Sequence, residues 1–334
     1  MTLHIRAWQA GDEARIMESF NAAFGEQRDA DYWRWKYLHD GQALAWLSVD
    51  EHGRVLTQLA AHPVRWQSAN GPLRVGHAGD AFALRLPVVA HGRTMLKTIA
   101  AFHRAQQAQG HLALLFGFPS ATLQGLHATM QALQGDEQPV RRWECAGLGL
   151  SEMESVRGQG PLPQGSLQQG VPVRDGLPSA AALDTLWQRC APRYALACPR
   201  DSDWVSWRFV QRPDVRDYHF LHCVDTADQL CAWVVLRVLG GVLWVADLLW
   251  SGDEPVLQAL LAACRACAAQ RGCARMALWL QGDATAIAVL QRSGWRDTSA
   301  AHPVRLFLHC YDKAPQAAWV RSALYLTKAD SDLI

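Results

Sequence analysis

The sequence predicts an α/β protein made of two similar mixed-sheet units with flanking helices. Three observations carry this prediction: strand-like apolar runs alternate with amphipathic helices, the same order of segments occurs twice, and a stretch rich in glycine, proline and glutamine separates the copies. At 334 residues the chain fits one large or two medium domains. We divide it into an N-terminal domain (1–150), a linker or surface loop (151–179), a C-terminal domain (180–312) and a C-terminal helix and tail (313–334).

The two copies share the order of their segments. Each opens on a tryptophan-rich amphipathic stretch, DYWRWKY in the first and DWVSWRF in the second, and strand-like runs follow. Each then has a strand with an aspartate (Asp80, Asp247) and a long helix closed by a glycine (Gly110, Gly272), which helix ends prefer. A buried strand ends each copy, HLALLFGF or RMALWL. The second copy is shorter before its helix, so an anion site at a helix start is favoured in the first.

Composition narrows the classes of partner. Half of the residues are hydrophobic, 19% are charged, and the net charge is +1, which gives no electrostatic reason to expect nucleic acid or a membrane surface. The most apolar region, from Cys231 to Trp250, is interrupted by Arg237, a Gly-Gly pair and Asp247. It predicts two buried strands around a turn rather than a membrane span.

The cysteines predict no metal centre. There are nine, and the C-x-x-C formed by Cys264 and Cys267, with Cys273 nearby, has no second pair at metal-ligand spacing. Reduced thiols packed as small apolar residues are the expectation, and with the charged N-terminus they predict a cytoplasmic protein. We expect a monomer or a homodimer.

The stretch VVAHGRTMLK predicts a short glycine loop that leads into the first long helix. A helix start offers unpaired backbone N–H groups and a partial positive charge, so its usual guest is an anion. Gly92 keeps the loop open, and His91 and Arg93 add positive charge. A plain strand-to-helix turn without a ligand is the alternative.

These segments resemble the GNAT acetyltransferase superfamily in its tandem two-domain form. That family has a splayed strand, a loop patterned Q/R-x-x-G-x-G/A before a helix, and a later N-x-x-A-x-x-x-Y followed by G-F or G-W. The second half matches the later motif with DATAIAVL and then GW; the first half has Ser120, Leu123 and His127 at the three positions. The opening segments also look like members linked to bacterial polysaccharide and amino-sugar pathways.

The resemblance implies acetyl-CoA, or another acyl-CoA, as co-substrate. In the family the loop amides bind the pyrophosphate, and the splayed strand, here Gly79 to Leu86, offers a backbone N–H to the thioester carbonyl. The loop departs from the pattern, with His91 where arginine is usual and Thr94 where glycine is usual. The implied cofactor-binding residues are Phe82, Ala83, Leu84, His91, Gly92, Arg93, Thr94, Met95 and Ser120.

The implied chemistry is direct attack of a primary amine on the thioester, which needs a base for the ammonium and an acid for the thiolate. Asp80 is the first candidate for the base, because an otherwise apolar strand would strengthen a carboxylate in that role. Asp80 could instead pin the strand end, as the matching Asp247 suggests. Glu26, Asp31 and His77 are weaker alternatives that would act through water. His127 is the candidate acid, with packing or solvation as its alternative role.

The acceptor is the least determined part of the reaction. Tryptophan faces suit sugar rings, so Trp33, Trp35, Trp204 and Trp207 could line a groove for an amino sugar, although their helical spacing fits core packing equally well. The tail KADSDLI carries two aspartates that could reach the active site.

Two further hypotheses stay open. The chain could be a non-catalytic acyl-CoA-binding or interaction protein, because both the loop and the acid position depart from the family pattern. The related duplicated fold that moves amino acids from aminoacyl-tRNA to peptidoglycan precursors would need a basic groove and usually a coiled-coil arm, and the sequence predicts neither. The leading hypothesis is a small-molecule N-acyltransferase that is active in its first half.

Overall fold

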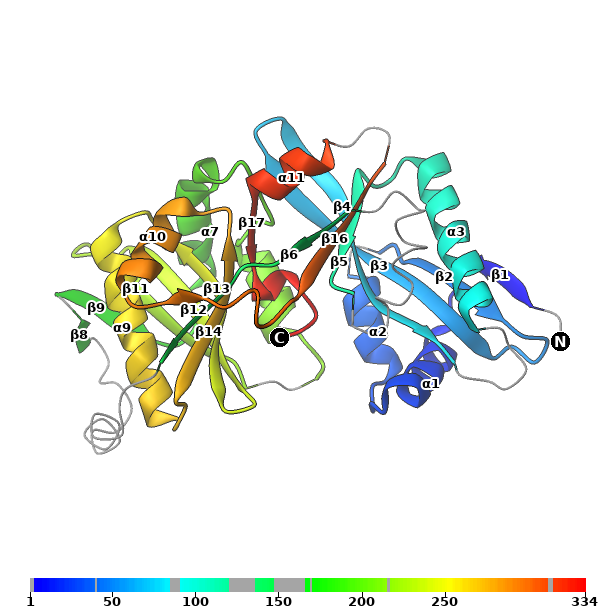
Figure 1. The fold of residues 1–334 in the computed structure, drawn as a ribbon, viewed down its shortest axis with the longest axis horizontal. Helices are drawn as coiled ribbons and strands as arrows, with labels where there is room; N and C mark the ends of the chain where they lie inside the picture. The colour runs from blue at the N-terminus through cyan, green and yellow to red at the C-terminus, as the bar shows by residue number, and fades with distance from the viewer. Residues whose placement is uncertain are drawn as a thin grey trace.

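The structure, a computed structural model, describes residues 3–39, 41–84, 91–119, 136–146, 166–168, 170–214, 217–311 and 315–334. Two α/β bodies lie side by side, and the C-terminal segment runs between them (Figure 1). The predicted fold class is therefore confirmed. Among the described residues, no helix is long and apolar enough to cross a bilayer.

The first body is a mixed sheet with helices on both faces. Its strands run in the order β1-β2-β3-β4-β5, antiparallel except for the parallel β4–β5 pair. Alternate residues of β2 face opposite sides: Leu44 packs with α3, and Ala45 packs with α1 and α2 (Figure 1). The bounds are β1 (His4–Ala7), α1 (Glu13–Phe24), α2 (Ala30–Tyr37), β2 (Leu44–Val49), β3 (Val55–Ser68), β4 (Gly71–Ala83), α3 (His91–Gln109) and β5 (Leu114–Gly117).

The second body repeats this plan. Its strands run β9-β11-β12-β13-β14, again with one parallel pair, β13–β14. Gly240 and Gly241 turn β12 into β13 with φ values of 57° and 74°, the conformation of a tight hairpin turn, so the two predicted strands are confirmed. The bounds are β8 (Ser166–Gln168), β9 (Val171–Asp175), α7 (Ala180–Cys190), η1 (Ala191–Arg193), β10 (Leu196–Ala197), α8 (Ser202–Val205), η2 (Ser206–Val210), β11 (His219–Val224), β12 (Leu230–Leu239), β13 (Val242–Trp250), α9 (Glu254–Gln270), β14 (Arg275–Gln281), α10 (Ala284–Arg292) and β15 (Arg296–Asp297).

Each sheet takes an end strand from the other half of the chain. β7 (Arg142–Ala146) pairs with β14 and β15, whereas β16 (Arg305–Cys310) pairs with β5 and with β6 (Asp136–Pro139). The domain boundaries drawn from the sequence remain a prediction, and the exchanged strands tie the two halves together. The strands β8 and β9 fall within the range 151–179 that the sequence assigned to a linker or loop.

The two bodies also meet through a reciprocal tryptophan pair. Trp35 and Trp207 hold matching places in the repeated tryptophan-rich segments, and their rings stack with centroids 5.3 Å apart. The indole N–H of each donates to the backbone carbonyl of the other, at 3.0 Å and 3.1 Å. Such mutual contacts are what two equivalent surfaces make around an approximate two-fold axis.

The C-terminal segment closes the junction between the bodies. After α11 (Ala317–Ala323), β17 (Leu324–Thr327) pairs with β10 and β14, and β10 pairs in turn with β3. The short helix η3 (Lys328–Asp330) follows and leads to the chain end. Residues from the last turn of the chain therefore reach both bodies.

Candidate functional site

The first sheet opens between β4 and β5. The parallel pairing runs from Val75 opposite Leu114 to Ala78 opposite Gly117, and it stops there because β5 ends while β4 continues. A side chain at Gly117 would stand 3.0 Å from the Ala78 carbonyl oxygen, so glycine permits the last close contact before the strands part. This is the splayed strand that the resemblance implies.

A bulge lies in β4 just beyond this point. On β3, Ala60 faces Gly79 and Gln58 faces Phe82, so Asp80 and Ala81 share the single partner Leu59. Asp80 has φ of 50°, a left-handed conformation that aspartate tolerates better than most residues. The bulge thus turns the Asp80 carboxylate out of the regular alternation of the strand.

The backbone beyond the bulge can donate into the opening. The N–H of Leu84 donates to Leu56 O at 2.8 Å, which makes that pair a hydrogen-bonded one. Antiparallel ladders alternate hydrogen-bonded and non-hydrogen-bonded pairs, so the N–H of Ala83, opposite Thr57, points away from β3. Of the three backbone donors that the resemblance implies, Ala83 has this orientation.

A cavity of about 340 Å³, cavity 1, occupies the opening. It passes through the sheet, because it is lined on one side by Phe20 and Phe24 of α1 and on the other by Met95 and Ile99 of α3. The tail residues Asp332 and Leu333 also line it. The cavity is therefore bounded by both halves of the chain.

The predicted anion-binding loop is partly helix. α3 begins at His91, so Gly92, Arg93, Thr94 and Met95 stand in its first turn, and the expectation that they precede the helix is wrong. A first helical turn keeps its unpaired N–H groups, so the anion hypothesis survives this shift. Thr94 and Met95 are buried, and Arg93 is exposed. Ser120 and His127 lie outside the described residues.

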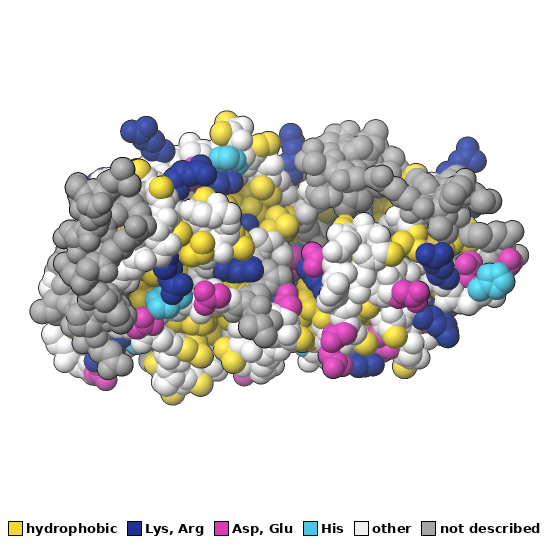
Figure 2. Space-filling model, turned by 90° about the horizontal axis from the view of Figure 1, so that it is seen from below, with side chains coloured by type: hydrophobic (Ala, Val, Ile, Leu, Met, Phe, Trp, Pro, Cys, Tyr) yellow, Lys and Arg dark blue, Asp and Glu magenta, His cyan; other side chains and the backbone are white. Residues whose placement is uncertain are grey.

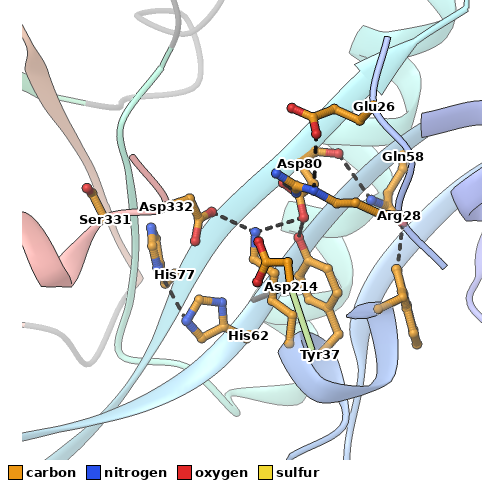
Figure 3. Close-up of polar contacts among 12 residues, drawn as sticks. Glu26, Arg28, Tyr37, Gln58, His62, His77, Asp80, Asp214, Ser331 and Asp332 are labelled. Carbon is orange, nitrogen blue, oxygen red and sulfur yellow. Dashed lines mark hydrogen bonds and ion pairs between the residues drawn. The ribbon is translucent and has the colours of Figure 1, made fainter. Parts of the chain in front are cut away.

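Asp80 is surrounded by donors and cations. Its carboxylate accepts from Lys36 Nζ at 2.7 Å and from the Tyr37 hydroxyl at 3.0 Å, and Arg28 lies 3.6 Å away (Figure 3). The expectation of an apolar setting for Asp80 is wrong, because α2 brings a lysine and a tyrosine directly under the bulge. The sequence carried half of this signal in the basic residue that follows the second tryptophan of each repeat.

Lys36 also binds the tail. Its Nζ donates at 2.7 Å to Asp332, and the lysine side chain is 1% exposed. Burial lowers the pKa of Lys36, but Asp332 and Asp80 outweigh it and raise the pKa above its ordinary value. Burial likewise acts to raise the pKa of Asp332, and Lys36 holds it well below its usual range. The tail thus reaches cavity 1 as a charged, tightly paired group.

Two buried histidines stand beside this cluster. His62 on β3 faces His77 on β4, and His77 Nδ1 lies 3.3 Å from His62 Nε2 (Figure 3). Burial lowers the pKa of His77 to about 4 and that of His62 well below its ordinary value, so both rings are neutral at pH 7. Sequence reasoning missed His62. The tight turn around Asn70 could have found it, because it sets the register that pairs the two rings.

Two further hollows lie behind cavity 1. Cavity 2, of about 20 Å³, is lined by His62, His77, Trp207 and Asp332. Cavity 3, a groove of about 520 Å³ at the junction of the two bodies, is lined by Trp204 and Trp207 among others. Trp33 instead is fully buried in the core, as the alternative interpretation predicted.

The thiols and possible metal ligands show a simple pattern. All nine cysteines are free, and all but Cys310 are buried. Burial raises the pKa of the Cys264 and Cys267 thiols, which fits packed rather than reactive cysteines. In the part of the chain that the structure describes, no three metal-ligating side chains gather.

Comparison with known proteins identifies the fold. No family model matches the sequence, and no curated protein matches it. Among solved structures, a probable N-acyltransferase from Enterococcus faecalis is similar with a TM-score of 0.63 at 10% identity, over 93% of this chain and 72% of that one. A GCN5-related N-acetyltransferase from Anabaena variabilis gives 0.63 at 11% identity, over 92% and 73%.

A third neighbour is Saccharomyces cerevisiae N-myristoyltransferase with bound myristoyl-CoA, with a TM-score of 0.55 at 10% identity, over 94% of this chain and 84% of that one. The chain therefore has the fold of the GCN5-related N-acetyltransferases, as the sequence motifs predicted. At these identities the likeness is one of fold, and the activity has to be argued from the site.

Proposed function

We propose that this chain is an acyl-CoA-dependent N-acyltransferase whose active site is cavity 1. The observation that carries the proposal is the coincidence of three features at one place: a sheet opened by a bulge, a cavity that passes through it, and a long helix that starts beside it. The opening admits a thioester, and the unpaired amides of the α3 start suit the pyrophosphate of CoA. The solved neighbours of this fold include acyltransferases, one with acyl-CoA bound.

In this proposal the amine nitrogen attacks the thioester carbonyl carbon, the C–S bond breaks, and the thiolate takes up a proton. The N–H of Ala83 is placed to donate to the carbonyl oxygen as it gains charge. Asp80, the base that the sequence favoured, is held by Lys36, Tyr37 and Arg28, so removing a proton from the amine competes with these contacts. His127 remains the proposed acid.

The acceptor is a primary amine, and an amino sugar is our first choice. The groove of cavity 3 supports this choice, because its walls combine the aromatic faces of Trp204 and Trp207 with Asp201 and Asp203. Aromatic faces stack on sugar rings and carboxylates attract ammonium groups. Basic and acidic side chains are interspersed on the face shown in Figure 2. A cytoplasmic location and a monomer or homodimer also remain proposals.

A non-catalytic acyl-CoA-binding protein is the second candidate. The specific observation in its favour is that both carboxylates nearest the opening, Asp80 and Asp332, are bound to Lys36. Such a protein would bind acetyl-CoA and turn over no amine.

Calorimetric titration with acetyl-CoA tests the proposal. We expect micromolar binding that is lost in Ala81→Trp, because Ala81 lines cavity 1 at the bulge. Ala108→Trp, at an exposed position near the end of α3, is the matched control and should bind like the wild type. Binding that survives Ala81→Trp would move the donor out of cavity 1. Release of CoA thiol with a panel of amines then separates enzyme from binding protein.

A further inference from the structure

The inference below rests on the proposed function and concerns the route of the proton. The attacking amine must lose a proton as its N–C bond forms, and the site is buried. The carboxylates nearest the bulge are already engaged by Lys36. A neutral buried base next to the cavity is therefore of interest, and His77 is one.

We propose that His77 accepts the proton of the attacking amine and passes it through His62 toward the groove between the two bodies. His77 lines both cavity 1 and cavity 2, so its ring stands between the reacting space and the next hollow. His62 lines cavity 2, and Trp207 lines both cavity 2 and the groove. These shared walls form a continuous line from the thioester to the junction.

The hydrogen bond between the rings gives the route its chemistry. His77 Nδ1 and His62 Nε2 are 3.3 Å apart, so one proton joins them. In the proposed direction, His77 Nε2 takes the proton from the amine, His77 Nδ1–H passes its proton to His62 Nε2, and His62 Nδ1–H gives one up. Each ring starts and ends neutral, one proton crosses, and the amine nitrogen keeps its new bond to the acyl carbon.

The far end of the route is suited to release a proton. Among the described residues, His62 Nδ1 is buried and has no hydrogen-bond partner. Cavity 2, at about 20 Å³, is large enough for one water molecule, which needs about 10–15 Å³. A buried donor beside a polar hollow of this size is the arrangement that a relaying water requires.

The surroundings keep both rings neutral between turnovers. Burial is the largest influence on the pKa of His77, and the nearby charges act in both directions, so that they partly cancel. A ring with so low a pKa cannot store the proton, and it must hand the proton on as it arrives. The groups that face the pair are Lys36 and Tyr37 from α2, His39 after it, Arg208 from η2, and Asp330 and Asp332 from the tail.

The test compares single-turnover rates of acetyl transfer from acetyl-CoA to the primary amine that the wild type acetylates fastest, from a panel of amino sugars and polyamines. We expect His77→Gln to lower kcat by about 100-fold or more with the KM for acetyl-CoA little changed, as loss of a general base does. His62→Gln should lower kcat by about 10-fold. The double variant should be no slower than His77→Gln, because the two rings act in series.

Two readouts separate a relay from a packing role. The residual rate of His77→Gln should rise with pH, because free amine then replaces the lost base, whereas a variant damaged only in packing keeps the wild-type profile. His219→Gln, a histidine on β11 of the second body, is the matched control and should leave kcat unchanged. Asp80→Asn keeps a residue that tolerates the left-handed backbone, and it should slow transfer less than His77→Gln.

The outcomes divide cleanly. A wild type that transfers acetyl while His77→Gln stays within about twofold of it, or effects of the two histidines that multiply, would overturn the relay and leave the proposed function standing. A wild type that acetylates no amine in the panel would overturn both.

Discussion

The two halves of the chain build the same opening, and only the first leaves it open. In both, a parallel strand pair parts beside a bulge that carries an aspartate, Asp80 in β4 and Asp247 in β13. In the first half the gap holds cavity 1. In the second, β17 continues the pairing, with Thr327 opposite Leu280 on β14.

The filling of the second opening comes from the end of the chain. The Lys328 ammonium lies over the rings of Trp244 and Trp279, at 4.3 Å and 4.4 Å from their centroids. Asp247 is fully buried, pairs with Arg200 at 3.0 Å and accepts from Thr327 at 2.7 Å. The comparison teaches that the fold supplies a place for a ligand, and that the segments around it decide whether the place is used.

The largest expected effect tests the two buried ion pairs against each other. Lys36→Met leaves Asp80 and Asp332 without their cation, and Arg200→Met does the same to Asp247 and Asp330. Each should lower the free energy of unfolding by about 3–5 kcal/mol, measured by denaturant titration. Only Lys36→Met should also weaken acetyl-CoA binding by the folded protein. The reverse pattern would place the working site in the second half.

The buried histidines predict a pH dependence of stability in the first half. The folded pKa of His77, about 4, lies below its unfolded value of 6.5, so the unfolded chain binds more protons between these values. The stability is fully present above pH 6.5 and is lost as pH falls toward 4, by about 3 kcal/mol for this ring.

His77→Gln should flatten this part of the curve of unfolding free energy against pH, whereas His219→Gln in the second half should change it far less. The same slope in the wild type and in His77→Gln would show that the ring is not buried as a neutral base.

The smallest effect concerns the reciprocal tryptophans. Trp35→Phe and Trp207→Phe each remove one indole N–H and leave one carbonyl without its donor. Each should lower the free energy of unfolding by about 1 kcal/mol, and the two values should agree within about 0.5 kcal/mol if the contact is symmetric. A large inequality would argue against an equivalent pair.

Much of the fold followed from local pattern. The repeated order of strands and helices predicted two mixed sheets, because periodicity and helix-ending glycines are local signals. The exchange of β7 and β16 did not follow, because the neighbour of an end strand depends on how the two bodies pack. No spacing in the sequence records that contact.

The site divides in the same way. Asp80 was found from its place in a strand, and the basic residue in the repeated segment pointed to Lys36. Asp332 lies 296 positions from Lys36, so no motif could join them. The setting of Asp80 was misjudged because strand residues reveal their own side chains and not those of the helix packed beneath.

A crystal structure of the protein with acetyl-CoA, without an acceptor, tests the central claim most directly. The account predicts the thioester in cavity 1 beside the β4 bulge, the pyrophosphate at the start of α3, and Lys328 still seated between Trp244 and Trp279. Acetyl-CoA in the second opening, with the C-terminal segment displaced, would contradict it.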